Sequence, residues 1–453
     1  MPVREPKLHT GSGLALAPQR MKMRHGFNEI YGWWHLSQGE HRAEIQRRLR
    51  LMETKVVRVF VFDQPVPDPF KDWHAFEGVL QAILDIGAKP MVTFAKFPPP
   101  YDRPKNISDF VSRASEVVWG CIERWGGDEV SQWYWCVWNE PNNLVVGGDL
   151  NFDQYRRIYE ELSDEIFRQL APYLGARQAL IGGPAIDGTH RAYWMDWVAR
   201  LLSEVDERKV GFVSWHNYGD WRPAVPSESL GLEMWGSPDS PNGELFESLL
   251  LAQTPGYETN ARGVARLLEG HGALNVCGEF NTMSHHEHYY TLGYNQNLLG
   301  AAYYMSALIH LVRGGADLEL RWTATAHSDA YGLVSRDGKP SPAALAKQLF
   351  AQHVQYDDEL YFPANSRELP KLDAIVARGA RGRISAMFVN SSKSAVTLAP
   401  RDILAELEGC DSLFRLDATT GEQAVAEKHG GRFTLNGYGI GVITNDGSQT
   451  VFD

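Results

Sequence analysis

Cysteine, positive charge and long apolar runs are all scarce in this chain of 453 residues. Its four cysteines, Cys121, Cys136, Cys277 and Cys410, include no Cys-x-x-Cys pair, which argues against a disulfide framework or a thiolate zinc site. Lys and Arg together number 44, against 56 for Asp and Glu. The resulting net charge of -12 argues against nucleic acid or an anionic membrane as a partner, because both bind to basic patches.

Apolar runs are short throughout the sequence. None approaches the roughly 20 residues that span a membrane. Residues 1–10 also lack the apolar segment of a secretory signal peptide. Together with cysteines that look reduced and buried, these features predict a cytoplasmic protein that has no membrane as a partner.

Aromatic residues, by contrast, are abundant: they make up 11% of the chain and include 14 tryptophans. Flat indole faces suit stacking on sugars, although protein cores use tryptophan too. Hydrophobic residues at 43% and charged residues at 22% are typical of a folded globular protein. The length suits a large barrel followed by a smaller module.

Strand-like and helix-like segments alternate eight times along the first part of the chain. The strands are expected at residues 23–28, 55–62, 90–95, 133–138, 179–184, 210–216, 273–279 and 318–323. The helices are expected at residues 40–53, 72–86, 107–124, 153–171, 190–205, 259–270, 293–313 and 341–354. Eight such units predict an α/β fold, a (β/α)8 TIM barrel. A long loop from Asn217 to Tyr257 is expected after the sixth strand.

The hydrophobic pattern of the sequence changes after Gln355, where helical periodicity ends. Short alternating runs separated by turn-forming residues predict a C-terminal antiparallel β-sandwich domain at residues 356–453. The catalytic barrel is then expected at residues 21–355. Residues 1–20 form an N-terminal extension, for which the β domain is a candidate packing surface.

Two glutamates end predicted strands and carry the chemistry. Glu140 follows an aromatic strand and precedes Pro141, which prevents a helix from including it. Desolvation there should raise its pKa and favour a proton donor, whereas an ordinary strand-end acid facing water is the alternative. Glu279 follows Gly278 at the end of the seventh strand, which faces the fourth strand across a barrel mouth. Two carboxylates aimed into one pocket are what glycosidic bond cleavage requires.

Further polar and aromatic residues fall at the same strand ends, the face where such barrels place their chemistry. These are Asn28, Asp63, His216 and Trp322. Arg58, pointing inward on the second strand, could lower the pKa of the nucleophile. Trp322 is either the apolar floor under a sugar or barrel packing. The loop tryptophans either line outer subsites or pack within their loops: Trp33, Trp34, Trp221 and Trp235. By strand alternation, Cys136 and Cys277 share the inward side with the glutamates, as small core residues.

The segment Trp138–Asn142 resembles the acid/base signature of clan A glycoside hydrolases. With Val137 included, it is most similar to glycoside hydrolase family 39, which contains β-xylosidases and α-L-iduronidase. Other matching segments occur in register along residues 20–355: Arg58, Lys89-Pro90, Gly182–Ala185, Phe212–Tyr218, Gly278–Asn281 and Gly332–Pro340.

The resemblance implies a retaining double displacement without a cofactor or a metal. Glu279 would be the nucleophile and Glu140 the acid/base, with their carboxyl groups about 5–5.5 Å apart. Asn139 would hold the hydroxyl beside the anomeric centre. His216 and Tyr218 match a position that contacts the nucleophile or the sugar, against a core histidine and a packing tyrosine. Asn28, Arg58 and Trp322 complete the expected substrate-binding set.

Three hypotheses remain open from the sequence. The first is a retaining, β-xylosidase-like glycosidase, or a relative acting on an arabinoside, galactoside or uronide. The second is a catalytically silent carbohydrate-binding protein on the same fold. The third is a metal-dependent hydrolase using His285, His286 and His288, which could instead shape a pocket or lie exposed. A carbohydrate is the expected partner, and the sequence leaves the sugar, its anomer and the oligomeric state, homo-oligomers included, open.

Overall fold

The computed structural model describes every residue except 1–17, 30–32, 63–66, 97–106, 145, 190, 220–242, 283–293, 326–330, 364–370, 404, 421–422 and 447–453. The expected candidates Asp63, Trp221, Trp235 and the histidines at 285, 286 and 288 lie outside the described residues. Among the helices that the structure describes, none combines the length and apolar character that crossing a membrane requires.

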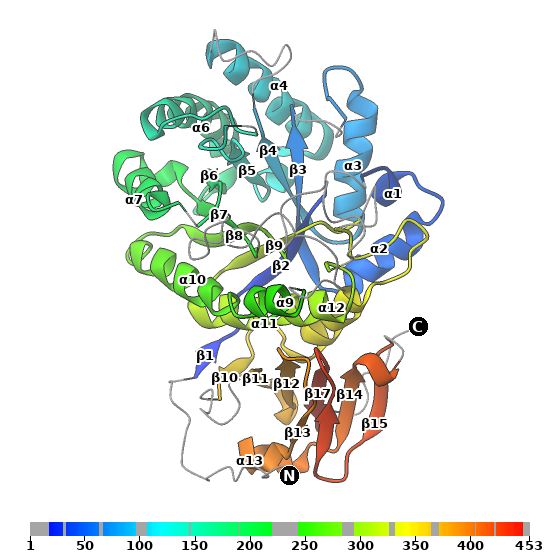
Figure 1. Cartoon of the computed structure of the whole chain (residues 1–453). Coiled ribbons are helices and arrows are strands. Elements are labelled where there is room, and N and C mark those ends of the chain that lie inside the picture. Colours follow the sequence, from blue (N-terminus) through cyan, green and yellow to red (C-terminus); the bar gives the residue numbers. More distant parts are fainter. Residues whose placement is uncertain are drawn as a thin grey trace.

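Eight parallel strands close into a barrel in chain order (Figure 1). They are β2 (Arg24–Asn28), β3 (Thr54–Val61), β4 (Lys89–Phe94), β5 (Tyr134–Val137), β6 (Ile181–Ile186), β7 (Phe212–Tyr218), β8 (Leu274–Asn281) and β9 (Leu318–Trp322). The strands are apolar on both faces because helices cover them outside and side chains fill them inside. The predicted TIM barrel is confirmed.

Helices surround the barrel and bury one apolar face each against the strands. The main ones are α2 (Arg42–Leu51), α3 (Trp73–Asp85), α4 (Ile107–Trp125), α6 (Phe152–Leu174), α7 (Trp194–Glu204), α10 (Pro255–Leu267), α11 (Leu298–Gly314) and α12 (Pro342–His353). Short helices occur at α1 (Trp33–Ser37), α5 (Gly127–Val130), α9 (Gly243–Leu251) and α13 (Pro400–Ile403). The prediction of a loop from Asn217 to Tyr257 is wrong in part, because α9 and the first turn of α10 lie within these residues.

The C-terminal region forms a seven-stranded antiparallel sheet in the order β1-β10-β11-β12-β17-β14-β15. Its strands are β1 (Gln19–Arg20), β10 (Glu359–Tyr361), β11 (Leu372–Arg378), β12 (Ile384–Asn390), β14 (Ser412–Leu416), β15 (Val425–Lys428) and β17 (Ile440–Thr444). A second sheet of β13 (Val396–Leu398) and β16 (Phe433–Leu435) covers part of one face through an apolar cluster. The sandwich is therefore uneven. The domain boundaries themselves stay a prediction.

The other face of the seven-stranded sheet packs on α11 and α12 (Figure 1). Consequently α11 is buried nearly all round, with 15 of its 17 residues buried, and α12 with 11 of its 12. Strand β1 pairs with β10 through Gln19 and Arg20. The chain thus contributes one strand to this sheet before it enters the barrel.

His310 on α11 links the barrel to the sheet. Its Nδ1 lies 3.2 Å from Glu258 Oε2 on α10, and its Nε2 lies 3.2 Å from Asp373 Oδ1 on β11. Burial alone would lower the pKa of His310, but the two carboxylates outweigh it and raise the pKa. Arg313 also approaches Glu258, at 3.5 Å. The protonated imidazole is therefore the stabilised form in the folded protein.

We expect the His310→Gln variant to be less stable than the wild type by about 1.5–3 kcal/mol at acidic pH, where two charge-assisted contacts are lost. A raised folded-state pKa gives stability that is complete below the unfolded value near 6.5 and lost as pH rises through the folded value. Urea unfolding from pH 5 to 9 should show the difference shrink as pH rises. The exposed His74→Gln serves as control, and a difference independent of pH would contradict the assignment.

Candidate active site

Glu140 stands on a tight turn directly after β5. Trp138 and Glu140 both have left-handed backbone conformations, with φ of 75° and 46°. Such conformations are unfavourable for these residues and persist only where the surroundings hold them. Here the Glu140 N–H donates to Ala185 O at 2.8 Å, and Trp138 Nε1 donates to Gly147 O at 2.9 Å. The turn thus directs the Glu140 side chain into the barrel mouth, where it is 6% exposed.

Glu279 approaches from β8 on the opposite side of the mouth. The pairing of β7 with β8 shifts register after Trp215, so that Glu279 pairs with His216, and the pairing of β8 with β9 also shifts between Cys277 and Phe280. Arg58 on β3 donates to Glu279 Oε1 at 2.5 Å, and the Tyr218 hydroxyl donates to Glu279 Oε2 at 2.9 Å. Both oxygens of this carboxylate are thereby fixed, and Glu279 is 4% exposed.

The two carboxylates lie close together around His216. One oxygen of each and a ring nitrogen of His216 all lie within 4.8 Å of one another. His216 Nδ1 is 2.8 Å from Glu140 Oε1 and 3.6 Å from Glu279 Oε2. Retaining glycosidases hold their carboxyl groups about 5–5.5 Å apart and inverting ones about 6.5–9.5 Å. With one oxygen of each within 4.8 Å of the other, the pair is compatible with the shorter separation.

Arg58 is the centre of the hydrogen-bond network beneath the carboxylates. Besides Glu279 it donates to Thr93 Oγ1 at 2.9 Å, to Asn28 Oδ1 at 3.2 Å and to Asn139 Oδ1 at 2.7 Å. Since a guanidinium can only donate, Asn139 must present its oxygen to Arg58 and turn its amide nitrogen away. That orientation suits Asn139 for donating to a substrate group.

Asn28 and Arg58, both expected among the substrate-binding residues, lie beneath the two carboxylates. Both are fully buried. The Asn28 amide nitrogen donates to the Gly278 and Leu320 carbonyls at 3.0 Å each, while its oxygen accepts from Arg58. In this structure their side chains support Glu279 and Asn139, and a direct contact with the substrate stays a prediction.

Burial and neighbouring charge separate the two carboxyl groups electrostatically. Burial, with a further contribution from the negative charge of Asp187, raises the pKa of Glu140 to about 8. Burial also raises the pKa of Glu279, but the Arg58 guanidinium opposes that rise. Burial lowers the pKa of His216 to about 4, so this ring is neutral at pH 7 and Arg58 is the cation that stabilises Glu279. Protonated Glu140 is therefore the favoured form of this residue at neutral pH.

Hydrogen bonds from the following loop position Glu140 and its neighbour. Asn143 Nδ2 donates to Glu140 Oε2 at 3.2 Å. Asn142 accepts from the Asp187 N–H at 2.9 Å, and Arg191 lies 3.3 Å from the Asp187 carboxylate. Sequence reasoning missed Asp187. It directly follows β6, so the strand-end rule that selected Glu140 could have found it.

Aromatic residues border the site. Trp322 ends β9 and is partly buried, with Phe60 edge-on at 5.9 Å between ring centroids. Arg58 in turn lies 4.5 Å above the Phe60 ring. Trp322 thus packs on Phe60, the ring that also contacts Arg58, and its role as a floor under the sugar stays a prediction. Trp33 and Trp34, expected in a loop, begin helix α1 instead, where Trp33 packs on the core and Trp34 is 50% exposed.

Glu140, His216 and Glu279 are also the group of side chains, among the described residues, that could hold a metal ion. Each has its own partners, however, and the Arg58 guanidinium already occupies the charged position at Glu279. A divalent cation there would lie against a buried cation, which is unfavourable. The donor set therefore fits acid–base chemistry better than metal ligation.

Comparisons with known proteins agree with this geometry. Residues 78–256 match the profile of the family described as glycosyl hydrolases family 39. The chain is 28% identical over 171 residues to a β-xylosidase of Geobacillus stearothermophilus, a match that covers 34% of this chain and 32% of that protein. It is 22% identical over 373 residues to a β-xylosidase of Caldicellulosiruptor saccharolyticus, covering 75% and 68%.

Solved structures share the fold at lower identity. A family 39 β-xylosidase from Caulobacter crescentus superposes with a TM-score of 0.60 at 15% identity, covering 96% of this chain and 98% of that one. A family 39 enzyme from Xanthomonas axonopodis pv. citri gives 0.59 at 14% identity, with 95% of each chain covered. At these identities the likeness shows the barrel with its appended β domain.

Proposed function

We propose that this chain, whose residues 78–256 match glycosyl hydrolase family 39, hydrolyses short β-xylosides by a retaining double displacement. The observation that carries the proposal is the pair Glu140 and Glu279, whose oxygens lie within 4.8 Å of each other in unlike surroundings. Glu140 contacts the neutral ring of His216, whereas Glu279 contacts the Arg58 guanidinium at 2.5 Å. That asymmetry supplies one acid and one nucleophile.

In the first step, a Glu279 oxygen attacks the anomeric carbon as its bond to the leaving oxygen breaks. Glu140 gives its proton to that leaving oxygen, so the aglycone departs as an alcohol. Tyr218 keeps the Glu279 carboxylate oriented, and the Asn139 amide nitrogen is placed to donate to the neighbouring sugar hydroxyl. The product is a glycosyl ester on Glu279 with inverted configuration.

In the second step, the Glu140 carboxylate takes a proton from water, whose oxygen attacks the anomeric carbon. The ester bond to Glu279 breaks, and Arg58 receives the restored carboxylate. Glu140 is protonated again and the sugar leaves with its original configuration. His216, neutral and 2.8 Å from Glu140 Oε1, holds this carboxyl group through both changes of protonation.

A panel of aryl glycosides tests the proposal most directly. It should cover xylose, arabinose, galactose, glucose and iduronic acid in both anomers, because the sequence leaves the sugar and its anomer open. We expect the β-xyloside to react with the highest kcat/KM and to release β-xylose first by NMR. Initial release of the α-anomer would indicate inversion and contradict the mechanism.

The same panel, repeated with a chelator, also distinguishes the two alternative functions. A carbohydrate-binding protein without catalysis would bind xylosides and turn over none. A metal-dependent hydrolase would lose activity in the presence of a chelator and regain it with a divalent cation. Full activity in EDTA is the result expected from Glu140 and Glu279 acting without a metal.

Asp187 is expected to set the basic limb of the pH profile. Its negative charge raises the pKa of Glu140, so Asp187→Asn should lower that pKa. Since the first step needs protonated Glu140, activity of the variant should decline at lower pH than that of the wild type. The measurement is kcat/KM against pH, with the exposed Asp196→Asn as control. An unchanged basic limb would remove Asp187 from this role.

The cytoplasmic location and the oligomeric state remain parts of the proposal. The four cysteines are free and buried, which fits a reducing compartment. Sedimentation velocity would distinguish a monomer from a homo-oligomer.

A further inference from the structure

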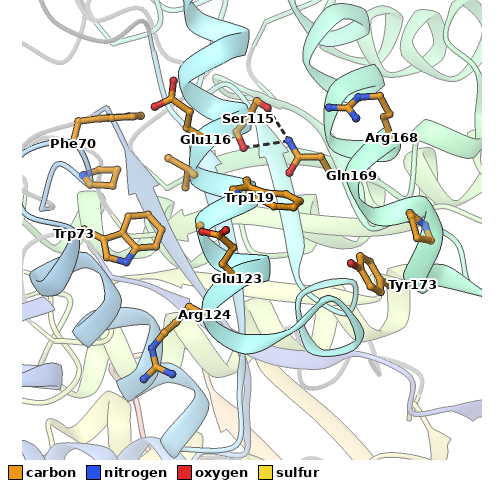
Figure 2. A pocket seen from close by; sticks show the side chains of 14 residues that line it. Phe70, Trp73, Ser115, Glu116, Trp119, Glu123, Arg124, Arg168, Gln169 and Tyr173 are labelled. Carbon is orange, nitrogen blue, oxygen red and sulfur yellow. Dashed lines mark hydrogen bonds between the residues drawn. The ribbon is translucent and has the colours of Figure 1, made fainter.

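A groove of about 860 Å³ lies on the outer surface of the helical ring, between α3, α4 and α6. Figure 2 shows the side chains that line it, with Trp119 of α4 between Trp73 and Tyr173. None of the lining residues belongs to the network around Glu140 and Glu279. The groove is therefore a separate feature of the barrel.

Aromatic rings form the groove and are held in place by helix backbone. A Cβ at Gly120 would lie 2.6 Å from Trp73 Cη2, and a Cβ at Gly127 would lie 2.4 Å from the Tyr173 ring. Both rings thus rest directly on glycines and are fixed as walls. Trp119 between them is 53% exposed, although burying an indole is strongly favourable. Because Trp73 and Tyr173 are held on these glycines, they do not cover Trp119, and its indole face is available to a ligand.

Hydrogen-bonding groups flank the exposed indole. Glu116 and Glu123 lie three residues before and four after Trp119, hence on the same helix face, and both are exposed without an ion pair among the described residues. Gln169 of α6 is only 9% exposed and donates to Ser115 Oγ at 2.7 Å, yet its Oε1 has no partner. A buried acceptor without a partner points to a missing donor.

The chemistry of this lining selects one class of ligand. Arg124 pairs with Glu77 and Arg168 with Glu165, so the unpaired charges of the groove are negative and disfavour an anionic ligand. A purely apolar ligand would desolvate Glu116 and Glu123 at a cost. A neutral sugar chain offers hydroxyl donors to carboxylates and a flat C–H face to an indole.

We propose that this groove is a second carbohydrate site, which binds a neutral oligosaccharide or polysaccharide chain by stacking one pyranose on Trp119. The choice of xylan as the chain rests on the proposed function. A site on the outer wall would hold the enzyme on a long chain while the barrel mouth acts on chain ends. It would leave the hydrolysis of a small aryl glycoside untouched.

Affinity electrophoresis in gels with soluble xylan tests the site, in the Glu279→Gln background so that the polysaccharide is not degraded. We expect Trp119→Ala to weaken binding on the order of 10-fold or more, as loss of a central tryptophan typically does. Trp119→Phe should bind at an intermediate level. Tyr356→Ala, an exposed aromatic outside the groove, should migrate like the parent. Alone, Trp119→Ala should keep its kcat/KM on an aryl β-xyloside.

Several outcomes would overturn the second site. Equal retardation of the parent and Trp119→Ala would do so, as would free migration of the parent in xylan, β-glucan, arabinan and galactan gels. A change of oligomeric state in Trp119→Ala would make the groove an interface between copies instead. Retardation that depends on Trp119, in a protein that hydrolyses no aryl glycoside, would support the second site while contradicting the proposed function.

Discussion

Replacing Glu279 by alanine should lower kcat/KM on an aryl β-xyloside by about 10⁴–10⁶-fold, the range seen when a covalent nucleophile is removed. The variant has no atom that can form the glycosyl ester, whereas the rest of the site remains. Azide is small and anionic, and the positive charge of Arg58 attracts it into the vacated space. With an activated aryl xyloside, azide should therefore restore turnover and give the α-xylosyl azide, the inverted product.

Loss of activity must be separated from loss of folding. Arg58 is fully buried, and removing its partner carboxylate leaves an uncompensated charge that costs about 3–5 kcal/mol. Glu279→Gln keeps a hydrogen-bond acceptor for Arg58 and should fold more stably while remaining inactive. Glu269→Ala changes an exposed glutamate beyond α10 and should be fully active. An azide product of retained configuration would assign the nucleophile elsewhere.

Glu140→Ala should show an effect that depends on the leaving group. For a xylobiose-like disaccharide, whose leaving alcohol needs a proton, the loss should be about 10²–10⁴-fold. For a dinitrophenyl xyloside the first step needs no acid, so the glycosyl-enzyme forms quickly and then accumulates, because no base activates water. A burst of phenol, and the ester on Glu279 found by mass spectrometry, are the expected observations.

The same variant should lose the basic limb of the pH profile. That limb reports the pKa of Glu140, near 8, above which the wild type lacks its acid. Asn143→Ala is a milder companion, since it removes one hydrogen bond to Glu140 and leaves the acid itself. If Glu140→Ala hydrolyses disaccharide and activated glycoside alike at wild-type rates, another residue is the acid.

The sequence was sufficient for the barrel because its signals are local. Parallel strands covered on both faces read as continuous β-branched and aromatic runs, and Pro141 marks where the strand must stop before Glu140. The fold class is confirmed, and the resemblance to family 39 is supported by a profile match over residues 78–256. The assignment of Glu140 and Glu279 as catalytic residues stays a prediction for the experiments above.

Other features depend on contacts that strand alternation alone cannot encode. Cys277 was expected on the inward side with Glu279, but it packs in the cluster between strands and helices, unlike Cys136 inside the barrel. The register shift after Cys277 changes the alternation, so that Glu279 still points inward. Asn28 and Arg58 lie on the expected strands. Their complete burial below the barrel mouth could not be predicted, because it depends on how the barrel closes. The pairing of Gln19 and Arg20 with β10 spans nearly the whole barrel sequence.

The burial of α11 and α12 on all sides bears on how this protein can change over evolution. Helices on the outside of an isolated barrel have a polar outer face. The outer faces of α11 and α12 are buried against the seven-stranded sheet instead. The β domain is therefore not an interchangeable attachment. A lineage could alter the mouth loops freely to accept new sugars, but it could not discard or exchange the β domain without redesigning two barrel helices at the same time.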